Sequence, residues 1–415
     1  MSSYARVVAF LLAAPPLGLA AQVTAADYAR AERLLGANAD KLVFRDRVTP
    51  QWIAGGDRFW YRIGTPAGSE FIYVDPAKRE RRPAFDQVRL AESLGMAADT
   101  ALKADSLPFV TLTWEEKGKG RSIVVEARQK KWRCDLTTYR CEAAGAAASP
   151  KPDEAASPDG QWVVFNRGHN LHIRSVATGQ ERALTTDGAF RYEYGAAPES
   201  NTSFVWMARL GRKLPPSVLW SPDSKRLLTY RLDQRGRPEL HLIQAVRSDS
   251  NPRPKLWSFV YPFPGDTAVS KGEWVVFDAA SGSKVMAKAP AFDVLFGSPI
   301  AMNEAWWKAD GGAAYIIQRE RGVRAFSLLR LDPASGTMET LAEERGPTLV
   351  EPSLLIGTKP NVRVLASGEL IWYSQSSGWA QLYLVSGGRR QPITSGPYVV
   401  REIVHVDEGA RRILF

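Results

Sequence analysis

The feature that most constrains the fold is a polar turn followed at once by an uninterrupted apolar run. Ser157-Pro158-Asp159-Gly160 leads into 162–165, which reads Trp-Val-Val-Phe, and Ser221-Pro222-Asp223-Ser224 leads into 227–230. Equivalent apolar runs follow turns elsewhere, at 59–61, 314–317, 370–373 and 413–415. Short runs of β-branched and aromatic residues between turn signals predict β-strands. The chain is therefore predicted to be all-β.

The apolar runs do not alternate with polar residues, so both faces of each strand must be buried. Four-stranded sheets stacked face to face around an axis achieve this, whereas the strands of a β-sandwich should alternate. A spacing of roughly 40–60 residues fits one blade per repeat. The sequence thus predicts a β-propeller of four-stranded blades. We expect it to be incomplete, and prone to self-association, because 413–415 has no following hairpin partner.

Two helices are predicted outside the strand repeats. The first begins at Asp27 as N-cap and ends at Gly36, which is placed as a C-terminal glycine. The second covers 86–94 and is closed by Gly95. The first gives the predicted propeller a short N-terminal helix.

Residues 1–26 have the pattern of a secretory signal peptide. Arg6 supplies a positive charge, 7–14 is apolar, and small residues follow. The apolar stretch is shorter than the roughly 20 residues that a membrane helix needs. The predicted location is periplasmic or secreted, and an uncleaved N-terminal anchor is the alternative.

Cys134 and Cys141 are the two cysteines of the chain. An exported chain enters an oxidising compartment, where so close a pair can form a disulfide across a hairpin. Two thiols supply half of a zinc shell, so no metal site is predicted, and no cofactor motif is present. The net charge is +10, but basic residues are interspersed with acids, which argues against a nucleic-acid partner.

Three segments carry a resemblance to a known family, and they are 214–230, 261–266 and 377–384. They resemble, in order, the N-terminal propeller of bacterial dipeptidyl peptidase IV-type serine peptidases of the prolyl oligopeptidase clan. The resemblance covers 27–415 and implies an eight-bladed propeller followed by an α/β-hydrolase domain. In that family the propeller gates substrate entry and binds the free amine of short peptides. The resemblance leaves a homodimer open.

Catalytic machinery is not found in the sequence. The family nucleophile lies in Gly-x-Ser-x-Gly, and the nearest segment, Gly120-Arg121-Ser122-Ile123-Val124, lacks the closing glycine. No catalytic residue is therefore assigned. The chain is interpreted as the non-catalytic, peptide-binding and substrate-gating propeller of such a peptidase, either as a truncated product or as one half of a split gene whose hydrolase domain is on another chain. A free-standing periplasmic propeller that binds a peptide or a protein is the alternative.

The resemblance also indicates where a peptide amine would bind. The family places adjacent glutamates in a loop after a Thr-x-Asp-Gly turn, which here is Thr185-Thr186-Asp187-Gly188. Glu193 matches the first acid of that run, but Tyr194 and Gly195 stand where the glutamate pair would be. Glu199 lies slightly downstream. We take Glu193 and Glu199 as the candidate substrate-binding residues.

Overall fold

The computed structural model describes residues 23–39, 42–53, 57–117, 120–128, 130–146, 151–247, 249, 251–294, 297–355 and 357–415. The chain divides into two compact units, residues 1–147 and 148–415. The sequence did not indicate this division, since 27–415 was predicted as one propeller domain. Most of the predicted signal peptide, 1–22, lies outside the described residues.

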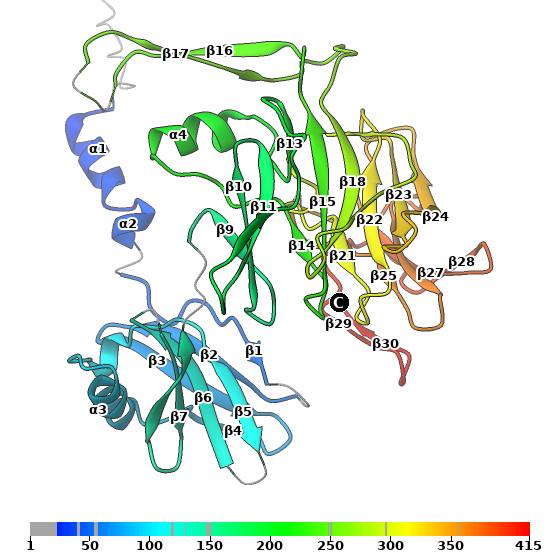
Figure 1. The fold of residues 1–415 in the computed structure, drawn as a ribbon. Coiled ribbons are helices and arrows are strands. Elements are labelled where there is room, and N and C mark those ends of the chain that lie inside the picture. The colour runs from blue at the N-terminus through cyan, green and yellow to red at the C-terminus, as the bar shows by residue number, and fades with distance from the viewer. Residues whose placement is uncertain are drawn as a thin grey trace, which may run out of the picture. The chain divides into compact units, whose positions relative to one another are not determined.

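Unit 1 contains two four-stranded antiparallel sheets, β1-β2-β3-β4 and β5-β6-β7-β8 (Figure 1). The strands are β1 (Gln51–Trp52), β2 (Phe59–Thr65), β3 (Gly68–Asp75), β4 (Glu80–Pro83), β5 (Thr113–Lys117), β6 (Gly120–Ala127), β7 (Lys130–Asp135) and β8 (Cys141–Ala146). One hydrophobic core joins both sheets to the helix α3 and includes Phe71, Leu90 and Ile123.

The helices differ at their ends from the prediction. Helix α1 (Ala25–Glu32) is capped by Thr24. The Thr24 side chain accepts the backbone N–H of Asp27, and the Asp27 side chain accepts the backbone N–H of Thr24, which together form a capping box. The predicted N-cap, Asp27, is therefore wrong by three residues. Gly36 does not end α1 but begins the short helix α2 (Gly36–Ala39).

The second predicted helix, 86–94, is present as α3 (Gln87–Ala97) with Asp86 as its N-cap, but Gly95 lies inside this helix and does not close it. A Cβ at position 95 would approach the carbonyl oxygen of Thr100 to 2.7 Å. Gly95 is thus explained by close packing rather than by helix termination. A short 3-10 turn, η1 (Ala104–Ser106), follows α3.

A disulfide joins neighbouring strands of unit 1. Cys134 of β7 and Cys141 of β8 are paired directly across the ladder, and their sulfur atoms are bonded at 2.02 Å. Cys134 is fully buried in the core of unit 1. The bond therefore ties the edge strand β8 to the packed interior.

Unit 2 contains four multi-stranded antiparallel sheets, which we call A to D in chain order (Figure 1). Sheet A contains β9 (Glu154–Ala156), β10 (Trp162–Arg167), β11 (Asn170–Ser175) and β12 (Glu181–Ala183). Sheet B contains β13 (Tyr192–Tyr194), β14 (Leu219–Trp220), β15 (Arg226–Asp233), β18 (Lys271–Asp278), β19 (Lys284–Met286) and β20 (Phe292–Asp293). Sheet C contains β21 (Ala305–Trp307), β22 (Ala314–Arg319), β23 (Ala325–Leu331) and β24 (Met338–Arg345). Sheet D contains β25 (Arg363–Val364), β26 (Leu370–Ser374), β27 (Gln381–Ser386) and β28 (Arg389–Pro392), and the hairpin β29 (His405–Asp407) and β30 (Arg412–Leu414) follows it.

The six strands of sheet B occupy four positions, because two short strands share the first position and two share the last. β13 and β14 both pair with β15, and the segment between them, 195–218, carries the π-helical turn η2 (Asn201–Trp206) and the helix α4 (Met207–Arg209). β19 and β20 likewise both pair with β18. Between β15 and β18 the chain forms a separate hairpin, β16 (Glu239–Gln244) and β17 (Lys255–Val260), which extends away from the sheets in Figure 1.

The polar turns fix where the second strand of a sheet begins. The Ser157 hydroxyl donates to Asp159 at 2.5 Å and accepts the backbone N–H of Trp162, the first residue of β10, at 3.0 Å. Ser221 does the same for Asp223 and for Arg226, the first residue of β15. The serine and the aspartate together close the turn and set the first residue of the next strand.

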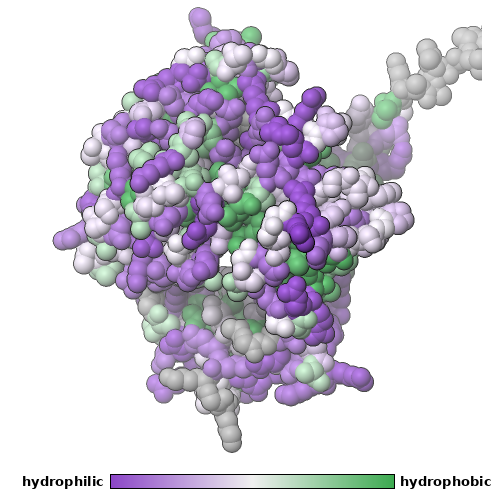
Figure 2. Space-filling model, turned by 90° about the vertical axis from the view of Figure 1, so that its right-hand side faces the viewer, coloured by the Kyte–Doolittle hydropathy of each residue, from purple (hydrophilic) through white to green (hydrophobic). Residues whose placement is uncertain are grey.

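Hydrophobic cores lie between consecutive sheets of unit 2. One joins sheets A and B, and others join B to C, C to D, and D to the last hairpin. All five residues of β26 are buried, which is what its uninterrupted apolar sequence predicts. The outer strand β28 is fully exposed and the face in Figure 2 is largely hydrophilic. Sheets stacked in this way are consistent with propeller blades.

Among the helices of the described residues, none has the length and apolar character needed to cross a bilayer.

Candidate functional site

The candidate acids lie around the first strand of sheet B. Tyr192, Glu193 and Tyr194 form β13, and Glu193 pairs with Leu232 of β15. This pairing places Glu193 near the end of β15, just before the chain leaves for the β16–β17 hairpin. The sequence placed Glu193 in a loop, whereas the structure places it on a short edge strand that is interrupted by the segment 195–218.

Glu193 presents a partly exposed carboxylate. Its side chain is 29% exposed and contacts Nδ1 of His169, which lies in the turn between β10 and β11. Phe190 is 63% exposed and packs edge-on against the His169 ring at 6.2 Å between centroids. A carboxylate, an imidazole and an exposed aromatic ring therefore lie together at this end of unit 2.

The carboxylate of Glu199 is already engaged by internal donors. Arg191 donates to both of its oxygens, at 2.9 and 3.0 Å. The backbone N–H of Val260, the last residue of β17, donates at 2.8 Å. The side chain is only 11% exposed. Glu199 thus fixes the insertion to the base of the β16–β17 hairpin, and the geometry favours Glu193 as the acid that can meet a ligand.

Arg191 is the centre of this buried polar group. Besides Glu199, it pairs with Glu239 of β16 at 2.5 Å, and the N–H of Gln234 donates to its carbonyl oxygen at 2.8 Å. The hydrogen bond to Glu199, aided by Glu239, raises the pKa of the Arg191 guanidinium above its usual value. The guanidinium therefore stays charged, and it links three segments that are far apart in sequence.

Tyr194 and Gly195, which stand where the resemblance would place a glutamate pair, have structural roles. Tyr194 is fully buried in the core between sheets A and B. Gly195 has φ +60°, and a Cβ there would lie 3.2 Å from the Thr229 hydroxyl oxygen. A carboxylate could not project toward a ligand from either position without a change in the core.

A second polar cluster crosses sheet B in one row. Tyr194, Arg231 and Glu273 are paired directly across three strands, and Arg231 donates to Glu273 at 2.6 Å. The Tyr194 hydroxyl donates to Asp187 at 3.0 Å. Although burial opposes it, the Tyr194 hydrogen bond, helped by Lys284 and Arg231, lowers the pKa of Asp187. Burial in turn raises the pKa of Tyr194. The hydrogen bonds among these four side chains hold β13, the strand that carries Glu193, against β15.

Metal-binding side chains are not clustered in the described part of the chain. No group of three or more histidine, cysteine, aspartate or glutamate side chains there could hold a metal ion. Ser122, from the nearest approach to a nucleophile motif, lies on strand β6 and donates weakly to Glu115 at 3.4 Å. What the arrangement around Glu193 offers is recognition of a cationic group.

The fold and this site define a class of protein. The chain is a mostly β protein of four-stranded antiparallel sheets, consistent with propeller blades, and it carries an insertion and a hairpin within sheet B. Residues 117–415 match the family described as "Dipeptidyl peptidase IV (DPP IV) N-terminal region". The chain belongs to this family, as the sequence resemblance predicted.

Curated relatives support the same assignment. Dipeptidyl-aminopeptidase B of Aspergillus niger is 24% identical over 234 residues, which cover 51% of this chain and 24% of that protein. "Probable dipeptidyl peptidase 4" of Emericella nidulans is 26% identical over 276 residues, 62% of this chain and 33% of the relative. The chain thus spans a third or less of these curated relatives.

Solved structures show the same fold. A "putative dipeptidyl aminopeptidase IV" from Bacteroides ovatus superposes with a TM-score of 0.58 and 15% identity, covering 89% of this chain and 50% of that one. Dipeptidyl peptidase 4 of Porphyromonas gingivalis gives 0.50 and 17% identity, covering 87% of this chain and 48% of that one. The likeness extends over nearly the whole chain and about half of each solved protein.

Proposed function

We propose that this chain is the peptide-binding, substrate-gating propeller of a dipeptidyl peptidase-like serine exopeptidase. Hydrolysis is assigned to an α/β-hydrolase domain outside these 415 residues. Unit 2 supplies the recognition surface, and Glu193 binds the free amino terminus of a short peptide. The chain acts after export, in the periplasm or outside the cell.

The observation that carries the proposal is the environment of Glu193. Its carboxylate is partly exposed and, among the described side chains, pairs with His169, whereas Glu199 is fully engaged. An ammonium group could replace His169 as the partner and form charge-assisted hydrogen bonds with the carboxylate. One acid in place of an adjacent pair predicts weaker selection for a free amine than a glutamate pair would give.

The disulfide supports the proposed location. Cys134 and Cys141 are bonded in the structure, and such bonds persist mainly in oxidising compartments. N-terminal sequencing of protein from a cell fractionated into periplasm and cytoplasm tests export. Recovery of the full-length chain from the cytoplasm with free thiols would contradict it.

Isothermal titration of the 415-residue chain with tri-alanine amide tests the binding role. Glu193→Gln should weaken binding about tenfold, because a hydrogen bond to a charged group contributes roughly 1.5–3 kcal/mol and this one is partly solvated. Glu339→Gln, at a 61% exposed acid on β24, is the matched control and should leave binding unchanged. The acetylated peptide should bind weakly and equally to all three proteins. An equal affinity of wild type and Glu193→Gln for the free-amine peptide would remove Glu193 from the site.

A further inference from the structure

The histidine that contacts Glu193 lies in a tight turn between β10 and β11. The two strands are paired as far as Arg167 and Asn170, so Gly168 and His169 form a two-residue loop. Both have positive φ, +55° and +68°, as in a type I′ hairpin turn. Glycine fits such a position without strain, so the turn does not explain why a histidine is present at 169.

This turn of sheet A is tied to the loop that leads to β13 of sheet B. The Asn170 side chain accepts the backbone N–H of Gly188 and the hydroxyl of Thr185, both at 2.9 Å. A Cβ added at Gly188 would lie 2.2 Å from the carbonyl oxygen of His169, so the two loops are in close contact. These contacts hold His169 in position beside Glu193, although the two residues belong to different sheets.

The imidazole and the carboxylate contact each other at the surface of unit 2. Nδ1 of His169 contacts the Glu193 carboxylate, and the two side chains are 41% and 29% exposed. Solvent protons and a ligand can therefore reach both groups. A neutral imidazole donates one hydrogen bond, whereas an imidazolium also carries a positive charge. Histidine is the side chain that changes charge between about pH 5 and pH 8.

The other charged groups of this region keep their charge over that range. Carboxyl groups titrate below it and guanidinium and lysine groups above it. His172, the second histidine of sheet A, stacks on Phe165 and contacts the carbonyl oxygen of Asn170. The neighbouring ion pairs of the loop 185–191, the β10–β11 turn, β15 and β18 are Arg167 with Glu181, Arg191 with Glu199, Arg231 with Glu273 and Asp187, Arg235 with Asp233, and Lys284 with Asp187.

We infer that His169 is a specificity-determining residue of the amine site, because it competes with the peptide amine for the Glu193 carboxylate and competes more strongly when it is protonated. The proton on His169 and the peptide amine therefore weaken each other's binding by the same factor. Binding of the peptide releases a proton to solvent, and the affinity rises with pH until His169 is neutral. This inference rests on the proposed peptide-binding function and adds the regulation of that site, which binds free amines near neutral pH and rejects them in acid.

Titration calorimetry of the 415-residue chain with tri-alanine amide tests the competition at about pH 5.5 and about pH 7.0, where histidine titrates and a peptide amine stays charged. Wild type should bind about fivefold more tightly at the higher pH, since an exposed ion pair contributes about that much. His169→Asn keeps a residue that tolerates positive φ but carries no charge, and its affinity should change by less than about twofold. His172→Gln is the matched control and should retain the wild-type ratio.

A second readout separates this role from a merely structural one. At about pH 6, the binding enthalpy measured in buffers of different ionisation enthalpy gives the number of protons released per peptide bound. Wild type and His172→Gln should release a fraction of one proton, and His169→Asn should release none. A histidine that only supported the turn would change the affinity without changing proton release.

The outcomes distinguish this inference from the proposed function. If wild type and His169→Asn bind the peptide with the same pH dependence and the same proton release, the competition is overturned while the binding role stands. If wild type does not bind the free-amine peptide at either pH, the proposed function fails and the inference fails with it.

Discussion

Glu199→Leu should destabilise unit 2 by about 2–3 kcal/mol. The substitution removes two hydrogen bonds from Arg191, at 2.9 and 3.0 Å, and the acceptor of the Val260 N–H at 2.8 Å. Removing one member of a buried ion pair typically costs about 3–5 kcal/mol. The expected cost is smaller here because Glu239 remains beside Arg191 and the two paired side chains are 14% and 11% exposed.

Urea unfolding followed by tryptophan fluorescence measures this change, with the transition of unit 2 analysed separately because two compact units need not unfold together. Arg191→Met combined with Glu199→Leu should cost less than Glu199→Leu alone, since the double variant leaves no largely buried guanidinium that has lost its main partner, and Glu239 is 32% exposed. Glu339→Leu, which breaks an exposed ion pair, should change the free energy of unfolding by less than about 0.5 kcal/mol.

Two results would refute this reasoning. A cost below about 0.5 kcal/mol for Glu199→Leu would mean that the carboxylate does not hold the hairpin base. A double variant no more stable than the single one would mean that the charge of Arg191 is not the source of the penalty.

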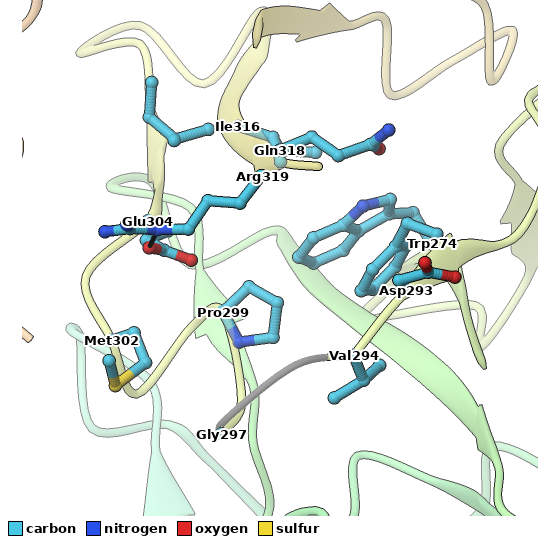
Figure 3. A pocket seen from close by; sticks show the side chains of 12 residues that line it. Trp274, Asp293, Val294, Gly297, Pro299, Met302, Glu304, Ile316, Gln318 and Arg319 are labelled. Carbon is cyan, nitrogen blue, oxygen red and sulfur yellow. Dashed lines mark hydrogen bonds and ion pairs between the residues drawn. The ribbon is translucent and has the colours of Figure 1, made fainter. Parts of the chain in front are cut away.

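Three further predictions concern other parts of the chain. In thermal melts, Gly195→Glu should lower the free energy of unfolding by at least about 1 kcal/mol, because the residue has φ +60° and an added Cβ would be crowded. Gly168→Ala, at a position with positive φ but open space around it, is the control and should cost less. A Gly195→Glu variant as stable as wild type would contradict the prediction. Replacing Cys134 and Cys141 by serine should cost about 2–3 kcal/mol in the chain-entropy account, and peptide mapping without reductant should recover the two peptides linked. Burial raises the pKa of Glu304 (Figure 3) above its usual value of 4.5, so the protonated side chain contributes fully to stability below that pH and this contribution is lost as pH rises through the folded pKa. Wild type should therefore lose stability relative to Glu304→Gln from about pH 4.5 toward neutrality. Parallel pH profiles of the free energy of unfolding for the two proteins would contradict this prediction.

Much of the strand framework could be predicted from local sequence. The runs at 162–165, 314–317 and 370–373 lie in β10, β22 and β26, because a polar turn fixes where each strand begins and apolar residues on both faces require stacked sheets. These signals are contained within a few residues, so no knowledge of distant contacts is needed.

The features missed by the sequence depend on long-range pairing. The split strands of sheet B are each two or three residues long, too short to leave a pattern of their own. His169 lies in a turn of sheet A and belongs to no motif in the sequence, so its contact with Glu193 of sheet B could not be predicted locally. Trp274 reads as an ordinary residue of an apolar strand, and nothing local shows that its N–H would remain without an acceptor among the described residues.

The central claim is that Glu193 receives the amino terminus of a peptide, and the most direct measurement is an experimental structure of the chain with tri-alanine amide. The account predicts the peptide amine within about 3 Å of the Glu193 carboxylate, as in a charge-assisted hydrogen bond, with His169 displaced from its present contact. A peptide bound with its amine elsewhere, while Glu193 remains paired with His169, would contradict the account.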